Sequence, residues 1–296
     1  MGETQKTQYI VDLIAWIEDN LTEELNIDTI AQKSGYSKWH MQRLFKEMTG
    51  QTVATYARKR RLTKSAMALR LTRLSLIDIA IRYGFDTQQN FTRAFRHHFA
   101  LTPHAYRYAD ELNTAAFHSR FNPLQQETRL PELVTLPDRV IYGESHRYEC
   151  LYGDFVEDKQ QILRQYLYDF IRDNKGSQEQ GYITLQFTPC AQRKEYHTVS
   201  LMRGLQQREG EYSLQAQRDI LPGGLWLKLA LQIDPCNFSG FIIDAYYHHL
   251  AQPGLTRRPG QDFLTLDLSR CSTEQLTGYL FVPVNFHLPN TAPLAS

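Results

Sequence analysis

The chain of 296 residues carries a formal net charge of +1, with 42% hydrophobic and 22% charged residues. This composition excludes a disordered or collagen-like chain, and the length predicts two domains because one hydrophobic core rarely grows beyond ~250 residues. No apolar run approaches the ~20 residues that a membrane helix needs, and residues 1–30 lack an export signal, so we expect a cytoplasmic protein with no membrane partner.

The charge is distributed unevenly along the chain. Residues 1–30 hold one lysine against seven acidic residues, a balance of −6. Residues 31–110 hold 15 basic against four acidic residues, a balance of +11, and the remainder carries −4. A local excess of this size is typical of a surface that binds phosphates. A solvated basic face is the alternative, and charge alone does not decide between the two.

The basic segment contains an internal repeat. Ile30-Ala31 recurs as Ile79-Ala80, an offset of 49 residues, and Arg43–Lys46 recurs as Arg93–Arg96, an offset of 50. Two copies are too few for a solenoid, so the repeat indicates a duplicated small module.

The first copy has the pattern of a helix-turn-helix. A short helix over Asp28–Lys33 has its apolar residues on one face, and Gly35 follows it where a left-handed cap is needed. Ser37 is a suitable N-cap for a second helix over Lys38–Glu47. The apolar residues of this second helix face the core, which leaves an outer face of Trp39, Gln42, Arg43 and Lys46.

The second copy repeats this pattern. Ile77, Ile79 and Ala80 form the inner face of its first helix, and Gly84 follows at the turn. Asp86 is the expected N-cap of a helix over Thr87–Phe99. The outer face of that helix consists of Gln88, Gln89, Asn90, Arg93 and Arg96.

Both outer faces have the side chains that read DNA bases. Arginine can grip guanine O6 and N7 together, and glutamine or asparagine can do the same with adenine N6 and N7. Any surface helix can carry such residues, but two tandem copies inside a basic segment favour double-stranded DNA as the partner.

One amphipathic helix is predicted between the copies, over Thr55–Leu71, with Leu62, Ala66 and Leu69 on its buried side. Its ~17 residues span ~25 Å, which suits two recognition helices about one DNA turn, ~34 Å, apart. We interpret the four basic residues at 58–61 mainly as phosphate or solvent contacts, which support affinity and salt dependence.

The stretches Ser34–Lys46, Gln88–Arg96 and Thr102–Arg107 resemble the AraC/XylS family of bacterial regulators, in particular its MarA, SoxS and Rob subgroup. The resemblance covers residues ~10–107. It implies an all-α domain of seven helices that binds DNA as a monomer, in two successive major grooves of an asymmetric site, and recruits RNA polymerase. At Ala100 the family usually has glycine, and alanine costs ~1 kcal/mol there if the position requires a positive φ.

The resemblance also implies roles for individual residues. Base reading is expected from Trp39, Gln42, Arg43, Gln89, Asn90 and Arg93. Contacts to the DNA backbone are expected from Lys38, Lys46, Arg58, Arg61, Gln88 and Arg96.

A second domain is predicted over residues 126–296, after the DNA-binding domain at 1–110 and a linker at 111–125 that lacks periodicity. Two helices are expected there, over Asp158–Asp173 and Asn237–Leu250, among seven short β runs. The runs are Val134–Leu136, Val140–Tyr142, Ile183–Phe187, Tyr196–Met202, Leu225–Leu231, Phe263–Leu268 and Tyr279–Val284. The order predicts a pseudo-duplicated β-α-β-β arrangement, an α+β domain with an antiparallel sheet.

This second half holds no catalytic motif, so neither an enzyme nor a catalytic residue is expected. The four cysteines, Cys150, Cys190, Cys236 and Cys271, form no CxxC pair, which argues against a metal site. No cofactor is expected either.

Residues 256–262 and 280–284 resemble the gyrase-inhibitor-like effector domain, and the two-domain order resembles the Rob branch of the subgroup. That resemblance implies an aromatic pocket with one acidic residue that favours cations, but the equivalent position here is Tyr279. We therefore expect a small hydrophobic or cationic effector, with Trp226, Tyr246 and Tyr279 as pocket candidates. Plain core packing is the alternative for each of them.

These features together predict a cytoplasmic bacterial transcription regulator, an activator of the multidrug or stress-response type. Two alternatives stay open. One is an architectural or origin-binding DNA protein with a structural second domain, and the other is a small-molecule hydrolase or drug sink in residues 126–296.

Overall fold

The computed structural model describes residues 3–23, 25, 27–34, 37–121, 123, 130–153, 161–205 and 217–287. The chain divides into two compact units. Unit 1 comprises residues 1–70, 74–108 and 116–128, and unit 2 comprises residues 71–73, 109–115 and 129–296. Among the described segments, no helix has both the length and the hydropathy to cross a membrane.

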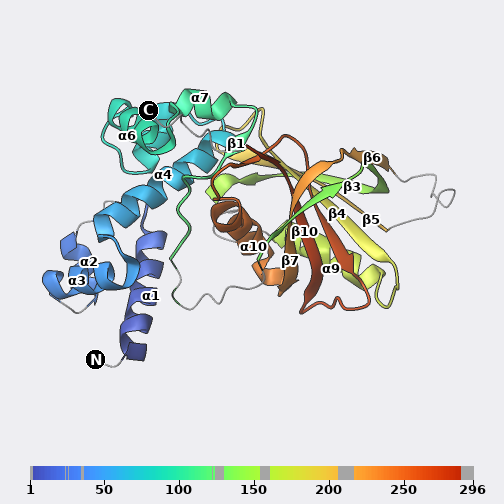
Figure 1. The fold of residues 1–296 in the computed structure, drawn as a ribbon, viewed down its shortest axis with the longest axis horizontal. Helices are drawn as coiled ribbons and strands as arrows, with labels where there is room; N and C mark the ends of the chain where they lie inside the picture. The colour runs from blue at the N-terminus through green and yellow to red at the C-terminus, as the bar shows by residue number, and fades with distance from the viewer. Residues whose placement is uncertain are drawn as a thin grey trace, which may run out of the picture. The chain divides into compact units, whose positions relative to one another are not determined.

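Unit 1 is helical, as expected (Figure 1). Its helices are α1 (Glu3–Asp19), α2 (Ile27–Ser34), α3 (Lys38–Thr49), α4 (Val53–Leu71), α5 (Leu76–Arg82), α6 (Gln88–Phe99) and α7 (Pro103–Tyr108). The two helix-turn-helix motifs are α2–α3 and α5–α6, and α4 runs between them (Figure 1). The predicted turn glycine of the first motif, Gly35, lies outside the described residues.

Each motif has its own core. In the first, aliphatic residues of α1 pack against α2, α3 and the start of α4, in a cluster that contains Ile10, Ile14, Ile17, Ile30, Met41, Leu44, Phe45, Val53 and Tyr56. In the second, the ring of Phe95 lies 5.5 Å from Phe91, 4.5 Å from Phe99 and 5.4 Å from Tyr106. Rings at these separations gain edge-to-face and offset contacts beyond their buried area.

The helix caps agree with the sequence patterns, with one correction. The Ser37 hydroxyl accepts a hydrogen bond from the His40 N–H and so caps α3 as expected. The N-cap of α6 is Thr87 and not Asp86, because the Thr87 hydroxyl is the group that accepts from the Asn90 N–H, at 3.1 Å. Ala100 ends α6 at φ 58° and, among the described residues, is the one non-glycine residue with a positive φ.

Two further expectations within unit 1 are wrong. Ile77 was assigned to the inner face of α5, but it is 41% exposed. It lies one turn from the exposed Ile81, whereas Ile79 and Ala80 are fully buried. Arg60 was interpreted as a phosphate or solvent contact, but it is only 3% exposed, because α4 is buried on several faces and Arg60 points into the unit.

Unit 2 contains an antiparallel sheet of ten strands within the described residues. The strands are β1 (Leu112–Asn113), β2 (Glu132–Leu136), β3 (Arg139–Leu151), β4 (Gln180–Pro189), β5 (Tyr196–Leu205), β6 (Gln217–Leu221), β7 (Gly224–Ile233), β8 (Leu255–Arg257), β9 (Asp262–Asp267) and β10 (Leu276–Phe286). All seven expected β runs fall on strands. β1 and β8 are not predicted because two or three residues leave no alternation to detect, and β6 is not predicted because it begins with three polar residues, Gln217 to Asp219.

The pairing order of the main sheet is β6-β3-β5-β4-β9-β10-β7-β2. β8 pairs with the end of β10, and β1 pairs with β8. Helix α9 (Gln161–Asp173) lies between β3 and β4, and residues 158–160 of that expected helix are outside the described chain. The second expected helix is α10 (Phe238–Asp244), extended by the π-helical turn η2 (Ala245–His249).

The described part of the expected linker at 111–125 makes contacts with both units. Leu112–Asn113 forms β1, and the buried Thr114 hydroxyl donates to the Leu250 carbonyl at 2.7 Å, both within unit 2. Residues from Ala116 onward belong to unit 1, where Phe117 is 6% exposed. Beyond residue 108 the chain therefore passes from unit 1 to unit 2, back to unit 1, and again to unit 2.

Candidate nucleic-acid interface

Helix α3 presents the first predicted recognition face. Trp39 is 69% exposed, and Gln42, Arg43 and Lys46 are exposed beside it, while Met41, Leu44 and Phe45 are buried. The Arg43 guanidinium lies over the Trp39 ring, 5.1 Å from its centroid. This stacking restrains the orientation of the guanidinium, which is a group that can form bidentate hydrogen bonds to guanine.

Lys38 lies at the start of the same helix, where backbone contact was predicted. Its ammonium group forms an ion pair with Asp28 of α2. Both side chains are more than half exposed, so the pair contributes little to stability, and a phosphate can replace the carboxylate as the partner of the lysine.

Helix α6 presents the second face. Gln88, Gln89, Asn90, Arg93 and Arg96 are all exposed, and the buried Phe91, Ala94, Phe95 and Phe99 hold the helix on its core. The Arg93 guanidinium donates to the Asn90 side-chain oxygen at 3.2 Å, which links two of the predicted base-reading residues.

The outer side of α6 borders an open groove of about 760 Å³. It is lined by Gln88, Gln89, Thr92, Arg93, Arg96, His97, Ala100 and Thr102. Thr92, His97 and Thr102 were not predicted as site residues. Helical spacing could have predicted two of them. Thr92 lies four residues after Gln88, and His97 lies four residues after Arg93, so each shares the outer face of α6 with a predicted residue.

The basic run at the start of α4 divides into different environments. Arg58 is exposed and available to a phosphate. Arg61 donates from Nε to the Leu21 carbonyl at 2.7 Å and from Nη2 to the Glu23 carbonyl at 2.6 Å, beyond the end of α1. Those two bonds to protein carbonyls favour a structural role for Arg61 over the expected contact with the DNA backbone.

Unit 2 has an aromatic face on its sheet. Trp226 pairs with Pro283 and Phe263 with Phe281, and side chains of paired residues share a face. The Phe263 ring stacks on Phe281 at 4.4 Å and meets Trp226 edge-on at 4.9 Å. Tyr279 lies two residues before Phe281 on β10 and is 38% exposed on the same face.

Two cations of the chain already lie against this face. The Lys228 ammonium is 4.3 Å from the Tyr279 ring centroid, and the Arg258 guanidinium is 4.8 Å from that of Trp226. Trp226 and Phe263 are buried in the core of unit 2, as the core-packing alternative predicts, whereas Tyr279 is 38% exposed.

Tyr246 is not part of this aromatic face. Its hydroxyl donates to the buried Asp262 at 2.6 Å and accepts from Arg257 at 2.6 Å. Burial, together with the Asp262 carboxylate, raises the pKa of Tyr246 well above its usual value. Since Asp262 precedes Phe263 on β9, its side chain points to the opposite side of the sheet. The structure therefore groups Trp226 with Tyr279 and separates both from Tyr246.

Two capped, exposed helix faces on one basic unit define the chain as a tandem helix-turn-helix protein of the DNA-binding class. A family model described as a helix-turn-helix domain matches residues 30–109. The chain is 35% identical to the transcriptional regulator Rob of Salmonella typhimurium and 36% identical to the right origin-binding protein of Escherichia coli K12. Each of these alignments covers 86% of this chain and 88% of the relative.

A shorter relative is the regulatory protein SoxS of Escherichia coli K12, 50% identical over 33% of this chain and 92% of its own length. The chain therefore belongs to the AraC/XylS family of transcription regulators, in the subgroup that contains Rob and SoxS.

Proposed function

We propose that the chain reads an asymmetric DNA site as a monomer, with α3 and α6 in two successive major grooves. The observation that carries this proposal is the pair of exposed faces, Trp39-Gln42-Arg43 on α3 and Gln89-Asn90-Arg93 on α6, each backed by a buried core. Phosphate contacts from Lys38, Lys46, Arg58, Gln88 and Arg96 would set affinity and salt dependence.

Substitution of one base-reading arginine tests the assignment. DNA bound by the full chain is selected from a random duplex pool, and affinities are then measured for the selected and for scrambled duplexes. Arg43→Ala should cost ~1–3 kcal/mol on the selected duplex and relax its sequence preference. Arg58→Ala should weaken selected and scrambled duplexes alike and lower the salt slope by about one unit.

Arg172→Ala is the matched control, because Arg172 is 65% exposed in unit 2. It should leave both affinities unchanged. Unchanged affinity and sequence preference with Arg43→Ala would refute the role of α3. A loss confined to the selected duplex with Arg58→Ala would refute the assignment of Arg58 to the DNA backbone.

The regulatory outcome is proposed to be activation through RNA polymerase, which the family membership supports. A second candidate, binding at a replication origin, is suggested by the name of the Escherichia coli relative. Genome-wide footprints distinguish them: sites upstream of transcribed genes with transcription changes support the regulator, and sites confined to the origin without such changes support the alternative.

Unit 2 is proposed to bind a small hydrophobic effector on its aromatic face. The symmetric pairing order of the sheet, in which β4 and β9 meet at the centre, supports the expected duplication of a β-α-β-β unit. Lys228, which is paired with Glu132 at 3.0 Å, and Arg258 already lie against the rings of Tyr279 and Trp226, so a cationic ligand would have to displace one of them. We therefore favour the hydrophobic alternative over the cationic one.

Two probes test this choice. N-phenyl-1-naphthylamine, which is neutral, should bind the full chain more tightly than the hydrophobic cation tetraphenylphosphonium. Trp226→Ala should weaken the neutral probe, and Tyr246→Phe, on the other side of the sheet, should have much less effect. Tighter binding of the cation, or equal effects of the two substitutions, would contradict the assignment.

A further inference from the structure

A segment that follows the helix-turn-helix domain lies along α4 of unit 1. It comprises residues 116–121 and is called the strap here. We propose that the strap is a positioning element for DNA recognition, which ties the two helix-turn-helix motifs together across α4 and so holds α3 and α6 at a set spacing. The proposal rests on the proposed use of both helices in one DNA site, and it assigns a role to residues beyond the family match, which ends at residue 109.

The strap begins against the second motif. The Ala116 carbonyl lies 2.8 Å from Nε2 of His98, near the end of α6. Phe117 is 6% exposed, and its ring meets Phe99 of α6 edge-on at 6.0 Å. The His118 ring stacks on His98 at 6.3 Å. This end of the strap is therefore fixed to the recognition helix of the second motif.

The middle of the strap is held by three side chains of α4. The His118 N–H donates to the Thr63 hydroxyl at 3.0 Å, Arg60 donates to the His118 carbonyl, and the Phe121 N–H donates to the Tyr56 hydroxyl at 3.4 Å. Positions 56, 60 and 63 share one face of a helix. The strap therefore runs antiparallel to α4.

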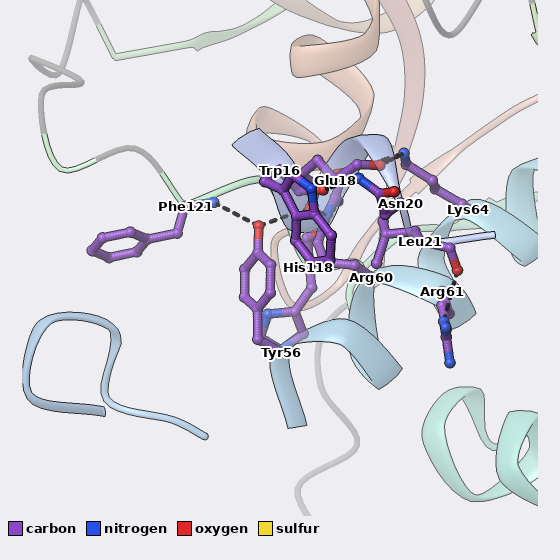
Figure 2. A network of polar contacts seen from close by, with 10 residues as sticks. All are labelled: Trp16, Glu18, Asn20, Leu21, Tyr56, Arg60, Arg61, Lys64, His118 and Phe121. Atoms are coloured by element: carbon purple, nitrogen blue, oxygen red, sulfur yellow. Dashed lines mark hydrogen bonds and ion pairs between the residues drawn. The ribbon is translucent and has the colours of Figure 1, made fainter. Parts of the chain in front are cut away.

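The same α4 side chains connect the strap to the first motif (Figure 2). Arg60 donates to both carboxylate oxygens of Glu18 on α1, at 2.6 and 2.9 Å, and the Tyr56 hydroxyl donates to Glu18 at 2.7 Å. Phe121 packs against the core of the first motif. Each end of the strap thus contacts a different motif, and its centre is bonded to the helix that joins them.

The physical consequence concerns how the two motifs cooperate. When two DNA-binding helices are linked, the affinity gained from the second helix depends on how well the connection holds that helix near its half of the DNA site. In the helical domain alone, α4 is the connection between α3 and α6, and the strap adds a second one. Buried ion pairs such as Glu18–Arg60 contribute little net stability against apolar replacements, so their value here lies in defined geometry.

Thr63 offers a clean way to release the strap. It is fully buried and so touches no DNA, and valine has nearly its shape but cannot accept the His118 N–H. The measurement uses a duplex selected by the full chain and two derivatives in which one half is scrambled. We define the coupling as the ratio of the affinity for the intact duplex to the affinities for the two half-scrambled duplexes.

Thr63→Val should lower the coupling about tenfold, a loss of ~1.4 kcal/mol, while each half-scrambled duplex is bound within about twofold of the wild type. Thr63→Ser, which keeps the hydroxyl, should restore the coupling. Phe117→Leu, at the end of the strap that contacts α6, should lower the coupling in the same sense. Thr184→Val, at a buried threonine of β4 in unit 2, is the matched control and should leave it unchanged.

The outcomes separate the hypotheses. Equal losses on all three duplexes would assign the strap to fold stability alone, and an unchanged coupling with both Thr63→Val and Phe117→Leu would show that it does not position the helices. Either result overturns this inference. If the wild-type chain itself prefers no selected duplex over a scrambled one, the proposed function fails instead.

Discussion

At the scale of single residues, the backbone conformation at the end of α6 carries an avoidable strain. Ala100 has φ 58°, a region in which a Cβ atom approaches the carbonyl oxygen and which glycine adopts without this cost. The family usually has glycine there, and the structure supplies the reason. The exposed side chain has no core to fill that would compensate for the strain.

Ala100→Gly should therefore raise the free energy of unfolding of unit 1 by ~1 kcal/mol, measured by denaturant unfolding or by hydrogen exchange of α6 amides. Ala54→Gly is the matched control, because Ala54 is exposed with ordinary helical geometry in α4. It should lower stability by up to ~1 kcal/mol. A destabilising Ala100→Gly would contradict the strain argument.

At the scale of elements, the strap places a neutral histidine in a cationic environment. Burial, with the charges of Lys59, His98 and Arg60, lowers the pKa of His118 to about 4. Burial is also the main cause of a lowered pKa at His98, on α6. A group whose folded pKa is depressed contributes stability above its unfolded pKa of ~6.5, and that contribution is lost as the pH falls toward the folded value.

Acidification from pH 7 to pH 5 should therefore loosen the strap. The loosening would appear as a lower protection factor of the Phe121 amide, which is the base-catalysed intrinsic exchange rate at each pH divided by the observed rate. His118→Phe keeps an aromatic ring and removes one titratable group, so the protection of the Phe121 amide in this variant should depend less on pH. Glu18 does not confound this window: burial alone would raise its pKa, but Arg60, Lys64 and Tyr56 outweigh that effect and lower it. Identical pH profiles for the variant and the wild type would contradict the prediction.

At the scale of the whole molecule, the near-neutral total charge conceals a basic segment between two acidic ones, with −6 over residues 1–30, +11 over 31–110 and −4 over the rest. Some of the acidic residues of the first segment serve the fold: Glu18 neutralises Arg60 inside unit 1. The outward cations of α3 and α6 have no such buried partners among the described contacts, which agrees with the phosphate and base contacts proposed for them.

The path of the chain leads to a prediction about fragments. Residues 1–112 contain both recognition helices and should bind DNA, but they lack the strap. Residues 1–128, which include it, should bind an intact selected duplex more tightly, whereas the two fragments should bind half-scrambled duplexes alike. Affinity titrations at one salt concentration provide the comparison, and equal affinities of the two fragments on the intact duplex would contradict it.

Local patterns determined much of this protein. Caps and helical spacing predicted the recognition helices and their outer faces, because an N-cap, a turn glycine and the i, i+3, i+4 period act between near neighbours in the chain. Alternation likewise located the seven main β runs. The resemblance carried by these motifs was sufficient for the family.

Tertiary structure decided what each similar residue does. Arg58, Arg60 and Arg61 are alike in sequence, yet one faces solvent, one is buried against Glu18 and one bonds carbonyls beyond the end of α1. Tyr246 and Trp226 are equal pocket candidates in the sequence, but the structure places Tyr246 on η2, bonded to Asp262, and Trp226 on β7, against Phe263. The strap has no sequence pattern at all. The physical reason is the same in each case: burial and hydrogen bonding join residues 16 to 65 positions apart, and no local period records such contacts.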